Sequence, residues 1–574
     1  MARYVLAIDA VTSPARASLR SVRPDMLALA VLLAIVVFLV IGLSQAFGPA
    51  PATQAISLSP GVLPMYAVRT TLRMLAALVA SLIFTFTYAT AAAKSRRAEV
   101  VLIPLLDVLQ SVPVLGYLSF TVVFFMSLFP GRALGAELAA VFAIFTSQAW
   151  NMAFSFYQSL RTTPHDLDEA ARAFRLTAWQ RFWRLDAPFA MPGLVWNMMM
   201  SMSGGWFFVV ASEAISVGDT RITLPGIGSY VARAVEERDL GAIGWAVAAM
   251  TCAIVVYDQL LFRPLVAWTD RFRVEQTAAT VVPRSWLVEL FRRASHVRRA
   301  GAWIGSGMQH VARARLALPH HRASRHRSAA DTLWYLGVVA VTALLAWRIA
   351  QTLAPALSRS DLERALVGGG FTLLRVVVLI ALATLVWVPI GVAIGLRPRL
   401  AEKVQPLAQF LAAFPANVLF PLAVYAIVKL GLRAELWLSP LMILGTQWYI
   451  LFNVIAGASA FPTDLREAAA TYRVHGWKWW RDVMLPGVFP YYVTGAITAS
   501  GGAWNASIVS EAVSWGPTKL HATGLGAYIA EMTERGDFAR IALGVIVMAV
   551  LVIAMNRLLW RPLYAFAERR TRLD

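Results

Sequence analysis

The segment Pro164-His165-Asp166-Leu167-Asp168-Glu169-Ala170-Ala171 recurs 298 residues later as Pro462-Thr463-Asp464-Leu465-Arg466-Glu467-Ala468-Ala469. Nine of the 25 positions that begin at Pro164 are identical, and several of them are Asp, Glu, Arg or Pro. Shared membrane composition would match Leu with Leu, not Glu with Glu. The same register continues through Gly204/Gly502, Trp206/Trp504 and Glu213/Glu511. The chain is therefore an internal duplication.

Composition places both copies in a membrane. The chain has 574 residues, of which 58% are hydrophobic and 15% charged, and its mean hydropathy is +0.61. Soluble proteins carry about 25% charged residues. Several uncharged runs reach the roughly 20 residues that a helix needs to cross a bilayer. The apolar runs lie near 26–43, 66–92, 100–129, 137–160, 188–216 and 240–262, and again near 332–350, 366–396, 404–430, 437–460, 487–515 and 540–560.

These runs predict an all-α integral membrane protein with about twelve transmembrane helices in two homologous six-helix halves. The first half covers residues 26–266 and the second 331–574, after an N-terminal arm of residues 1–25. The run at 26–43 is longer than a signal-peptide core and lacks an obvious cleavage site, so we expect a retained helix. Six crossings per half give both copies the same orientation, related by an axis along the membrane normal.

The basic charge follows this topology. The net charge of +20 could indicate a nucleic-acid partner, but its distribution argues against one. With a cytoplasmic N-terminus, 37 of the 52 Lys and Arg residues fall in cytoplasmic segments, nine in periplasmic loops and six in helices. This asymmetry is what the positive-inside rule predicts, and it places both termini in the cytoplasm. The single cysteine, Cys252, rules out a disulfide within the chain.

A basic linker, residues 267–330, joins the halves and carries 12 Arg but only three acidic residues. Two interpretations fit it. Residues 287–311 could form amphipathic helices on anionic lipid headgroups. The favoured interpretation is a tether whose charge keeps it cytoplasmic. Its histidines lack a metal-ligand spacing, so no metal site is predicted.

The duplicated segment lies in a polar cytoplasmic stretch between the fourth and fifth helices of each half, at 161–187 and 462–486. Pro and Asp are typical of a helix start, and acidic residues in the first turn suit the helix dipole. The paired alanines leave one side of the helix smooth. A Glu-Ala-Ala segment with a downstream Pro, in this place, resembles the EAA loop of binding-protein-dependent ABC importer permeases with the type I fold.

In that family the loop forms a coupling helix that docks into a groove of the ATPase subunit. The resemblance implies this role for Asp166, Glu169, Ala170, Ala171, Arg175, Asp464, Glu467, Ala468, Ala469 and Arg473. The alternative for the two glutamates is that they only cap a solvated helix. One departure is clear: many family members have Gly six residues after the Glu, where this chain has Arg175 and Arg473.

The resemblance also implies partners and a solute class. The chain has no Gly-x-x-x-x-Gly-Lys-Ser/Thr phosphate loop and no cofactor of its own, so ATP and Mg would act on two separate ATP-binding cassette ATPase subunits. The Ser-Glu-Ala and Leu-Pro-Gly-Ile-Gly runs look like the duplicated permeases of the nitrate, sulfonate, taurine and bicarbonate group. That similarity implies a small anion as solute, a periplasmic solute-binding protein, contact with membrane lipid, and a multi-pass location in a bacterial inner membrane.

Two intramembrane acids, Glu213 and Glu511, are the first candidates for the transport path, because a charge at the bilayer centre costs on the order of 3 kcal/mol. They could gate the path, or each could pair with Arg73 or Arg375. The full set of path candidates is Trp206, Ser212, Glu213, Trp504, Asn505, Ser510 and Glu511. Weaker candidates are Gln148, Asn151, Asn197, Gln447 and Asn453, since intramembrane amides often only join helices.

Two other classes of protein compete with this interpretation. A secondary transporter with twelve helices in two parallel repeats would work without an ATPase, but it leaves the twin Glu-Ala-Ala segments unexplained. A membrane enzyme would need a motif such as His-Glu-x-x-His or an activated nucleophile, and the sequence contains none.

Overall fold

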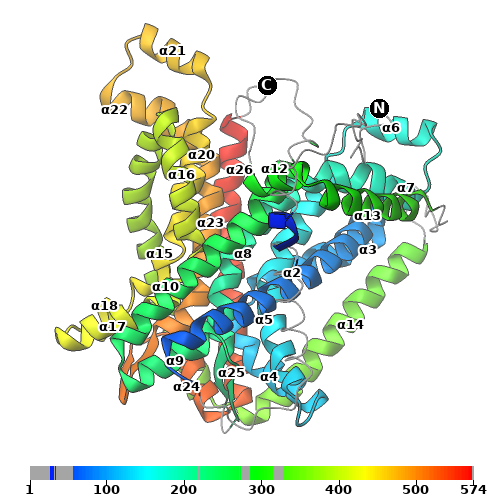
Figure 1. The fold of residues 1–574 in the computed structure, drawn as a ribbon. Coiled ribbons are helices and arrows are strands. Elements are labelled where there is room, and N and C mark those ends of the chain that lie inside the picture. Colours follow the sequence, from blue (N-terminus) through cyan, green and yellow to red (C-terminus); the bar gives the residue numbers. More distant parts are fainter. Residues whose placement is uncertain are drawn as a thin grey trace.

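The structure is a computed structural model that describes residues 26–30, 33, 56–217, 220–269, 272, 285–314 and 329–571. The predicted arm at 1–25, most of the first predicted helix at 26–43 and much of the linker lie outside these residues. Within them the chain is mostly helical (Figure 1).

The long helices follow the predicted order in both halves. The first half contains α2 (Leu63–Lys94), α3 (Arg96–Ser111), α4 (Val114–Leu128), α5 (Ala133–Arg161), α8 (Ala187–Glu213), α9 (Ile227–Glu237), α10 (Leu240–Tyr257) and α11 (Arg263–Thr269). The second half contains α14 (Ala329–Leu353), α15 (Arg359–Gly395), α16 (Pro398–Ala413), α17 (Phe420–Lys429), α18 (Ala434–Trp437), α19 (Leu441–Leu444), α20 (Gln447–Ser459), α23 (Leu485–Ser510), α24 (Leu525–Arg535), α25 (Phe538–Met555) and α26 (Arg561–Thr571).

Within the described residues, seven helices are long and apolar enough to cross a membrane, and ten spans result if each of three bent pairs is one span. Helix α23 is not among them, although it is the repeat equivalent of α8. Its sequence is rich in Thr, Ser, Gly and Asn, which lowers its hydropathy. The number of twelve helices stays a prediction, because most of 26–43 is not described.

Three runs that the sequence presents as continuous are bent. Helices α3 and α4 meet at 101°, α16 and α17 at 70°, and the segment 434–444 meets α20 at 42°. The first two breaks contain Pro113 and Pro415, both with extended backbone. Proline disfavours helical backbone in the residue before it, which ends α3 at this point. The apolar run alone could not distinguish a straight span from a bent one.

Each fifth helix ends earlier than its apolar run. Residues 188–216 and 487–515 were expected to be helical, but the chain leaves the helix after Glu213 and after Ser510. It then forms two antiparallel hairpins, β1 (Ala214–Val217) with β2 (Thr220–Thr223), and β3 (Ala512–Trp515) with β4 (Thr518–His521). The alternating and β-branched residues of these segments suit a hairpin. The fold is therefore helical with two small hairpins, rather than all-α.

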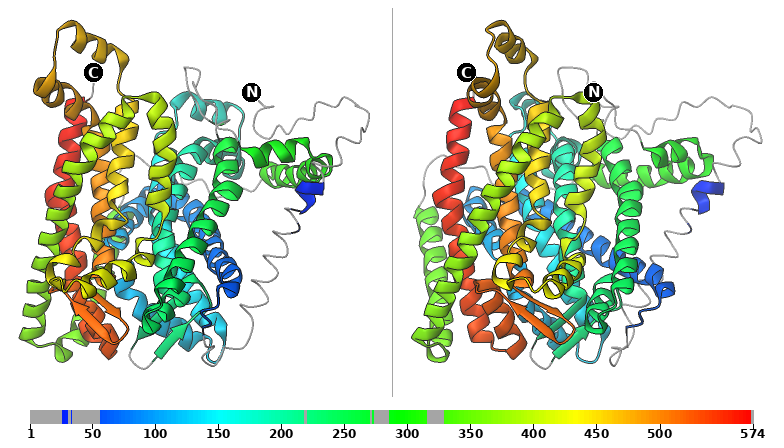
Figure 2. Two further views of the ribbon diagram at one scale, coloured as in Figure 1. Left: turned by 60° about the vertical axis from the view of Figure 1, so that its left-hand side comes forward. Right: turned by 90° about the vertical axis from the view of Figure 1, so that its left-hand side faces the viewer.

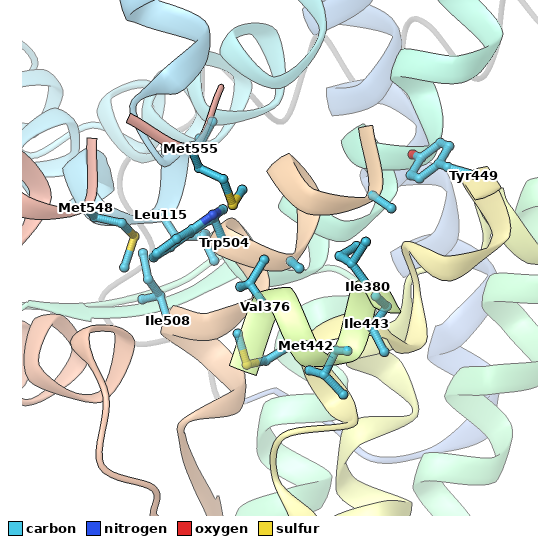
Figure 3. Close-up of a cluster of buried hydrophobic side chains, with 14 of the residues drawn as sticks. Leu115, Val376, Ile380, Met442, Ile443, Tyr449, Trp504, Ile508, Met548 and Met555 are labelled. Atoms are coloured by element: carbon cyan, nitrogen blue, oxygen red, sulfur yellow. The ribbon is translucent and has the colours of Figure 1, made fainter. Parts of the chain in front are cut away.

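The two halves exchange an arm across their interface. Helix α4 of the first half packs into the core of the second, where Leu115 lies beside Trp504, Ile508 and Met548 (Figure 3). Reciprocally, α17 of the second half packs into the core of the first half through residues such as Phe420. Neither core is complete without the other half.

The linker contributes two helices, α12 (Trp286–Arg293) and α13 (Ser295–Arg313), which run across the bundle rather than along it (Figures 1 and 2). Trp286 Nε1 donates to Gln259 Oε1 at 3.2 Å, and Gln180 Nε2 donates to the Arg313 carbonyl at 3.0 Å. The linker is thus attached to the first half. Its role as a tether stays a prediction.

We expect Leu118→Ala, in the exchanged helix α4, to destabilise the whole protein by about 2–5 kcal/mol, because Leu118 is only 5% exposed in the core of the other half. Thermal unfolding followed by size-exclusion chromatography in detergent measures this change. Leu336→Ala in α14 is the matched control, since Leu336 is 64% exposed. Equal unfolding temperatures for the two variants would contradict the exchanged-arm packing.

Candidate coupling surface and transport pathway

The two Glu-Ala-Ala segments form short helices at the same end of the molecule. They are α6 (His165–Ala173) and α21 (Thr463–Thr471), each of nine residues, followed by α7 (Ala178–Arg181) and α22 (Gly476–Trp479). Both stand out from the bundle at the top of Figure 1, whereas the hairpins lie at the opposite end (Figure 2). The structure therefore presents two equivalent projections on one face.

Most of the predicted docking side chains are accessible there. Asp166, Glu169 and Ala170 are exposed, as are Asp464, Glu467 and Ala468 in the second copy. Glu169 contacts the exposed His165, at 3.2 Å. The second alanine of each pair, Ala171 or Ala469, is buried against the rest of its half. The buried alanine of each pair thus packs the short helix against the protein. The exposed alanine leaves the outer side of the helix without a bulky side chain next to the glutamate.

Arg175 and Arg473, the residues at which the sequence departs from the resembled pattern, both adopt left-handed backbone, with φ of 47° and 51°. Each closes the C-terminal turn of its short helix in a Schellman motif. In the first copy Leu176 N donates to the Ala171 carbonyl at 3.1 Å, and Arg175 N to the Arg172 carbonyl at 2.9 Å. This backbone favours glycine, because it costs a residue with a side chain about 1–2 kcal/mol.

An exposed aromatic residue precedes each of these arginines and was not singled out from the sequence. Phe174 is 79% exposed and Tyr472, its repeat equivalent, is 81% exposed. Large aromatic side chains are the usual anchors of protein interfaces. Their equal spacing from the Glu-Ala-Ala segment was visible in the repeat, but their exposure was not.

A buried polar cluster marks the opposite end of the first half. The Glu213 carboxylate accepts from Arg73 at 2.6 Å, from Thr70 Oγ1 at 2.7 Å and from Gly228 N at 2.7 Å. Arg73 also makes a two-pronged contact with Glu137, at 2.6 and 2.7 Å. Glu213 is completely buried and Arg73 is 4% exposed. The cluster joins α2, α5, α8 and the turn after the hairpin.

The second half repeats this cluster. Glu511 accepts from Arg375 at 3.1 Å, from Thr372 Oγ1 at 2.8 Å and from Gly526 N at 2.8 Å. Arg375 contacts Glu435 at 2.5 Å. Glu137 and Glu435 are separated by the repeat offset of 298, as are Glu213 and Glu511. The offset could have identified Glu137 and Glu435 from the sequence, although they were not selected.

The glycines of the Leu-Pro-Gly-Ile-Gly run, and those of its repeat equivalent at 522–526, are needed because the chain passes close to these acids and to the helices that carry them. A Cβ atom on Gly226 or Gly524 would overlap the carboxylate of Glu213 or Glu511. A Cβ on Gly228 or Gly526 would overlap backbone of the preceding long helix. The glycines therefore let the turn close over a buried carboxylate.

A cavity of about 590 Å³ lies between the halves. Of the seven path candidates only Asn505 lines it, together with the weaker candidates Asn151, Asn197 and Asn453. Gln148 and Gln447 do not line it. Trp206, Ser212, Glu213, Trp504, Ser510 and Glu511 are buried elsewhere. The glutamates make the arginine pairs that the sequence left open as an alternative, and their gating role stays a prediction.

The cavity wall is uncharged. None of its described lining residues is Asp, Glu, Lys, Arg or His. Its polar members include Ser203 and Tyr449, whose hydroxyls hydrogen-bond across the interface between the halves. In the described part of the chain, no three His, Cys, Asp or Glu side chains cluster as a metal site would require.

Two fused bundles around an uncharged central cavity, with paired projections at one end, define a membrane transport subunit. Comparison with known families agrees: the profile described as "Binding-protein-dependent transport system inner membrane component" matches residues 83–263 and again 387–572. The chain belongs to this family and contains its domain twice. It is thus a duplicated, multi-pass permease of the inner membrane.

Several curated proteins resemble parts of the chain. The bicarbonate transport system permease protein CmpB of Synechococcus elongatus is 27% identical over 206 residues, which cover 36% of this chain and 71% of CmpB. The nitrate import permease protein NrtB of Leptolyngbya laminosa is 25% identical over 188 residues, 33% of this chain and 63% of NrtB. The glycine betaine/carnitine transport permease protein GbuB of Listeria monocytogenes is 30% identical over 173 residues, 29% of this chain and 54% of GbuB. No solved structure matches significantly.

We expect Arg175→Gly and Arg473→Gly to stabilise the two short helices. Glycine removes the strain of left-handed backbone from the folded state but loses more conformational entropy on folding, and the net gain in stability is about 0.5–1 kcal/mol. Amide hydrogen exchange in α6 and α21 should therefore slow about two- to fivefold. Arg172→Gly, within α6, is the control and should accelerate exchange. Faster exchange in Arg175→Gly would refute the left-handed assignment.

Arg73→Ala should destabilise the protein by about 3–5 kcal/mol, because it leaves the buried Glu213 and its partner Glu137 without a cation. The control Arg364→Ala removes an exposed contact with Glu531, at 3.3 Å, and a cation–π contact with the Tyr528 ring at 5.8 Å, and should cost about 1 kcal/mol or less. Detergent thermal unfolding of both variants measures the difference. If Arg73→Ala unfolded like the control, the cluster would not hold the outer end of this half together.

Proposed function

We propose that this chain is the transmembrane subunit of an ATP-driven importer. It would carry a small solute, an anion of the nitrate, sulfonate or bicarbonate type, from the periplasm to the cytoplasm by alternating access. The observation that carries this proposal is the pair of exposed, equivalent helices α6 and α21 on one face of a two-fold bundle.

Import from the periplasm to the cytoplasm requires that the two projections lie on the cytoplasmic side. A topology of twelve crossings with both termini in the cytoplasm would meet this requirement. The ten candidate spans become eleven when α23 is added as the equivalent of α8, and twelve with the apolar run at 26–43. Positive-inside placement then puts α6, α21 and the linker in the cytoplasm, and the hairpins in the periplasm. A periplasmic solute-binding protein would dock at the hairpin end.

Two projections imply two ATPase subunits, which would bind ATP and Mg and hydrolyse the ATP. Each projection offers an acid, a smooth alanine and an exposed aromatic: Glu169, Ala170 and Phe174 in the first, Glu467, Ala468 and Tyr472 in the second. The aromatic side chains would enter the ATPase surface, and the alanines would permit close approach. Asp166, Asp464, Ala171, Ala469, Arg175 and Arg473 would shape these two helices.

A path for force leads from the first projection into the bundle. Asp168 on α6 contacts Arg181 on α7, and Arg181 Nε donates to Asp186 Oδ1 at 3.3 Å. Asp186 directly precedes α8 and also pairs with Lys94, at the end of α2, at 2.7 Å. Movement of α6 by an ATPase would therefore reach two long helices. Closing the ATPase dimer would draw the projections together and open the cavity toward the periplasm.

The relatives favour an anion but include betaine permeases, so a zwitterion is the second solute candidate. A secondary transporter is the alternative mechanism. It would leave the paired projections without a partner, and the family to which the chain belongs is described as binding-protein-dependent.

The docking proposal predicts that an ATPase subunit co-purifies with the chain from native membranes in mild detergent. Glu169→Lys with Glu467→Lys should reduce the retained ATPase at least about tenfold, through unfavourable charge and lost hydrogen bonds. Glu237→Lys with Glu534→Lys is the control, because it makes the same charge change on exposed positions of α9 and α24, at the opposite end. A chain that purifies alone yet moves solute in liposomes would instead be a secondary transporter.

A further inference from the structure

We infer that the linker helices α12 and α13 form a binding surface for anionic lipid headgroups, and that lipid bound there steadies the first of the two projections. The inference rests on the proposed function only in placing the linker on the cytoplasmic side of the membrane. It comes from the position, the charge and the exposed aromatic residues of the two helices.

The position of the pair is the first support. Both helices run across the bundle rather than along it (Figures 1 and 2). The carbonyl of Arg313, the last residue of α13, accepts from Gln180, which lies near the start of a candidate membrane span. Trp286, the first residue of α12, donates to Gln259, close to the end of the apolar helix α10. Helices attached where spans end, and lying across those spans, lie in the plane of the membrane interface.

The charge of the pair is the second support. Residues 285–314 carry five arginines but one acidic residue, Glu289. All five arginines are exposed, namely Arg292, Arg293, Arg298, Arg299 and Arg313. Arg293 pairs with Glu289, whereas Arg298 and Arg299 make no ion pair with any described residue. Clusters of Arg beside the cytoplasmic ends of membrane helices attract the phosphate groups of anionic lipids.

Exposed tryptophans are the third support. Trp303 on α13 is 80% exposed and Trp286 on α12 is 47% exposed. Tryptophan is enriched at the level of the lipid headgroups, where its ring meets apolar chains and its N–H meets polar groups. Leu287, Ala294 and Ala312 are buried and attach the pair to the protein. The exposed tryptophans and arginines are therefore left available to lipid.

The lipid surface acts on the first projection through Gln180. Gln180 and Thr177 form a capping box at the start of α7, the helix that follows α6. The same Gln180 side chain donates to α13. Its repeat equivalent is Lys478, whose ammonium has no acceptor and cannot form a capping box. Lipid bound at α13 therefore steadies one projection and not its repeat equivalent.

The experiment measures amide hydrogen exchange in the full-length chain, together with any ATPase subunit that co-purifies. The chain is placed in nanodiscs of phosphatidylcholine alone, or of phosphatidylcholine with phosphatidylglycerol. We expect exchange in α13 to slow at least about fivefold in the anionic discs at low salt, since each arginine at an anionic surface contributes about that factor. High salt should reduce the difference. Exchange in α6 and α7 should slow as well, and exchange in α21 should not.

Arg298→Gln with Arg299→Gln should remove most of the difference between the two lipids. Arg298→Lys with Arg299→Lys should retain it, because both charges are kept. The matched control is Arg233→Gln with Arg535→Gln, which removes the same charge from exposed positions of α9 and α24 at the opposite end. This control should leave the exchange of α13 unchanged in both lipids.

The outcomes separate this inference from the proposed function. Equal exchange of α13 in the two lipids would overturn the lipid surface. Protection that appears in either lipid, and only when an ATPase subunit is retained, would also overturn it, because the two helices would then bind protein. A response of α13 that leaves α6 and α7 unchanged would overturn the effect on the projection. A lipid response in a chain that retains no ATPase would support the surface and contradict the importer.

Discussion

A helix inside a bilayer can break only where protein covers the break, because lipid offers no partner to a free backbone N–H or C=O group. This chain breaks its helices at Pro113 and Pro415, and both breaks lie against the other half. At the first break the other half satisfies a backbone group, because Asn505 Oδ1 accepts from Val114 N at 2.8 Å. At the second break the side chain of Asn417 donates to the Phe207 carbonyl of the first half at 2.9 Å. Because the breaks must be covered, α4 and α17, the helices that follow them, each pack against the other half, and the two hydrophobic cores therefore contain residues of both halves.

The same constraint places the cavity. Where two bent pairs turn toward the interface, their helix ends face one another across a space that neither half could enclose alone. The duplication is conserved closely at the outer ends, where Arg73 and Arg375 hold equivalent acids. It has diverged at the cavity, where the repeat equivalent of Ser201 is Ala499 and that of Asn151 is Tyr449. A symmetric frame therefore surrounds an asymmetric cavity, as is expected if the frame keeps the halves folded and the cavity is the proposed transport pathway.

The coupling surface, unlike the helix breaks, is exposed to water, which can hydrogen-bond to the free backbone N–H and C=O groups of its short helices. Short helices close with Schellman turns at Arg175 and Arg473, in backbone that favours glycine. Those arginines are exposed, so the strain is local and the long helices do not depend on it. In the proposed function the projections would move with a docked ATPase subunit, while Arg181 and Asp186 connect the first of them to α8.

The sequence by itself determined the duplication, the membrane class and the two Glu-Ala-Ala segments, because each is a pattern of residue types at fixed spacing along the chain. It also offered Arg73 and Arg375 as partners of Glu213 and Glu511, as one of two alternatives, since a charge within the membrane is costly. Only the tertiary structure decided that Glu137 and Glu435 complete those clusters, that the fifth helices end in hairpins, and that α4 and α17 also pack into the core of the other half. It also decided that Trp150, Ser201, Thr446 and Trp560 share one cavity. These facts depend on which side chains meet across the interface, and neither periodicity nor hydropathy records a contact between residues hundreds of positions apart.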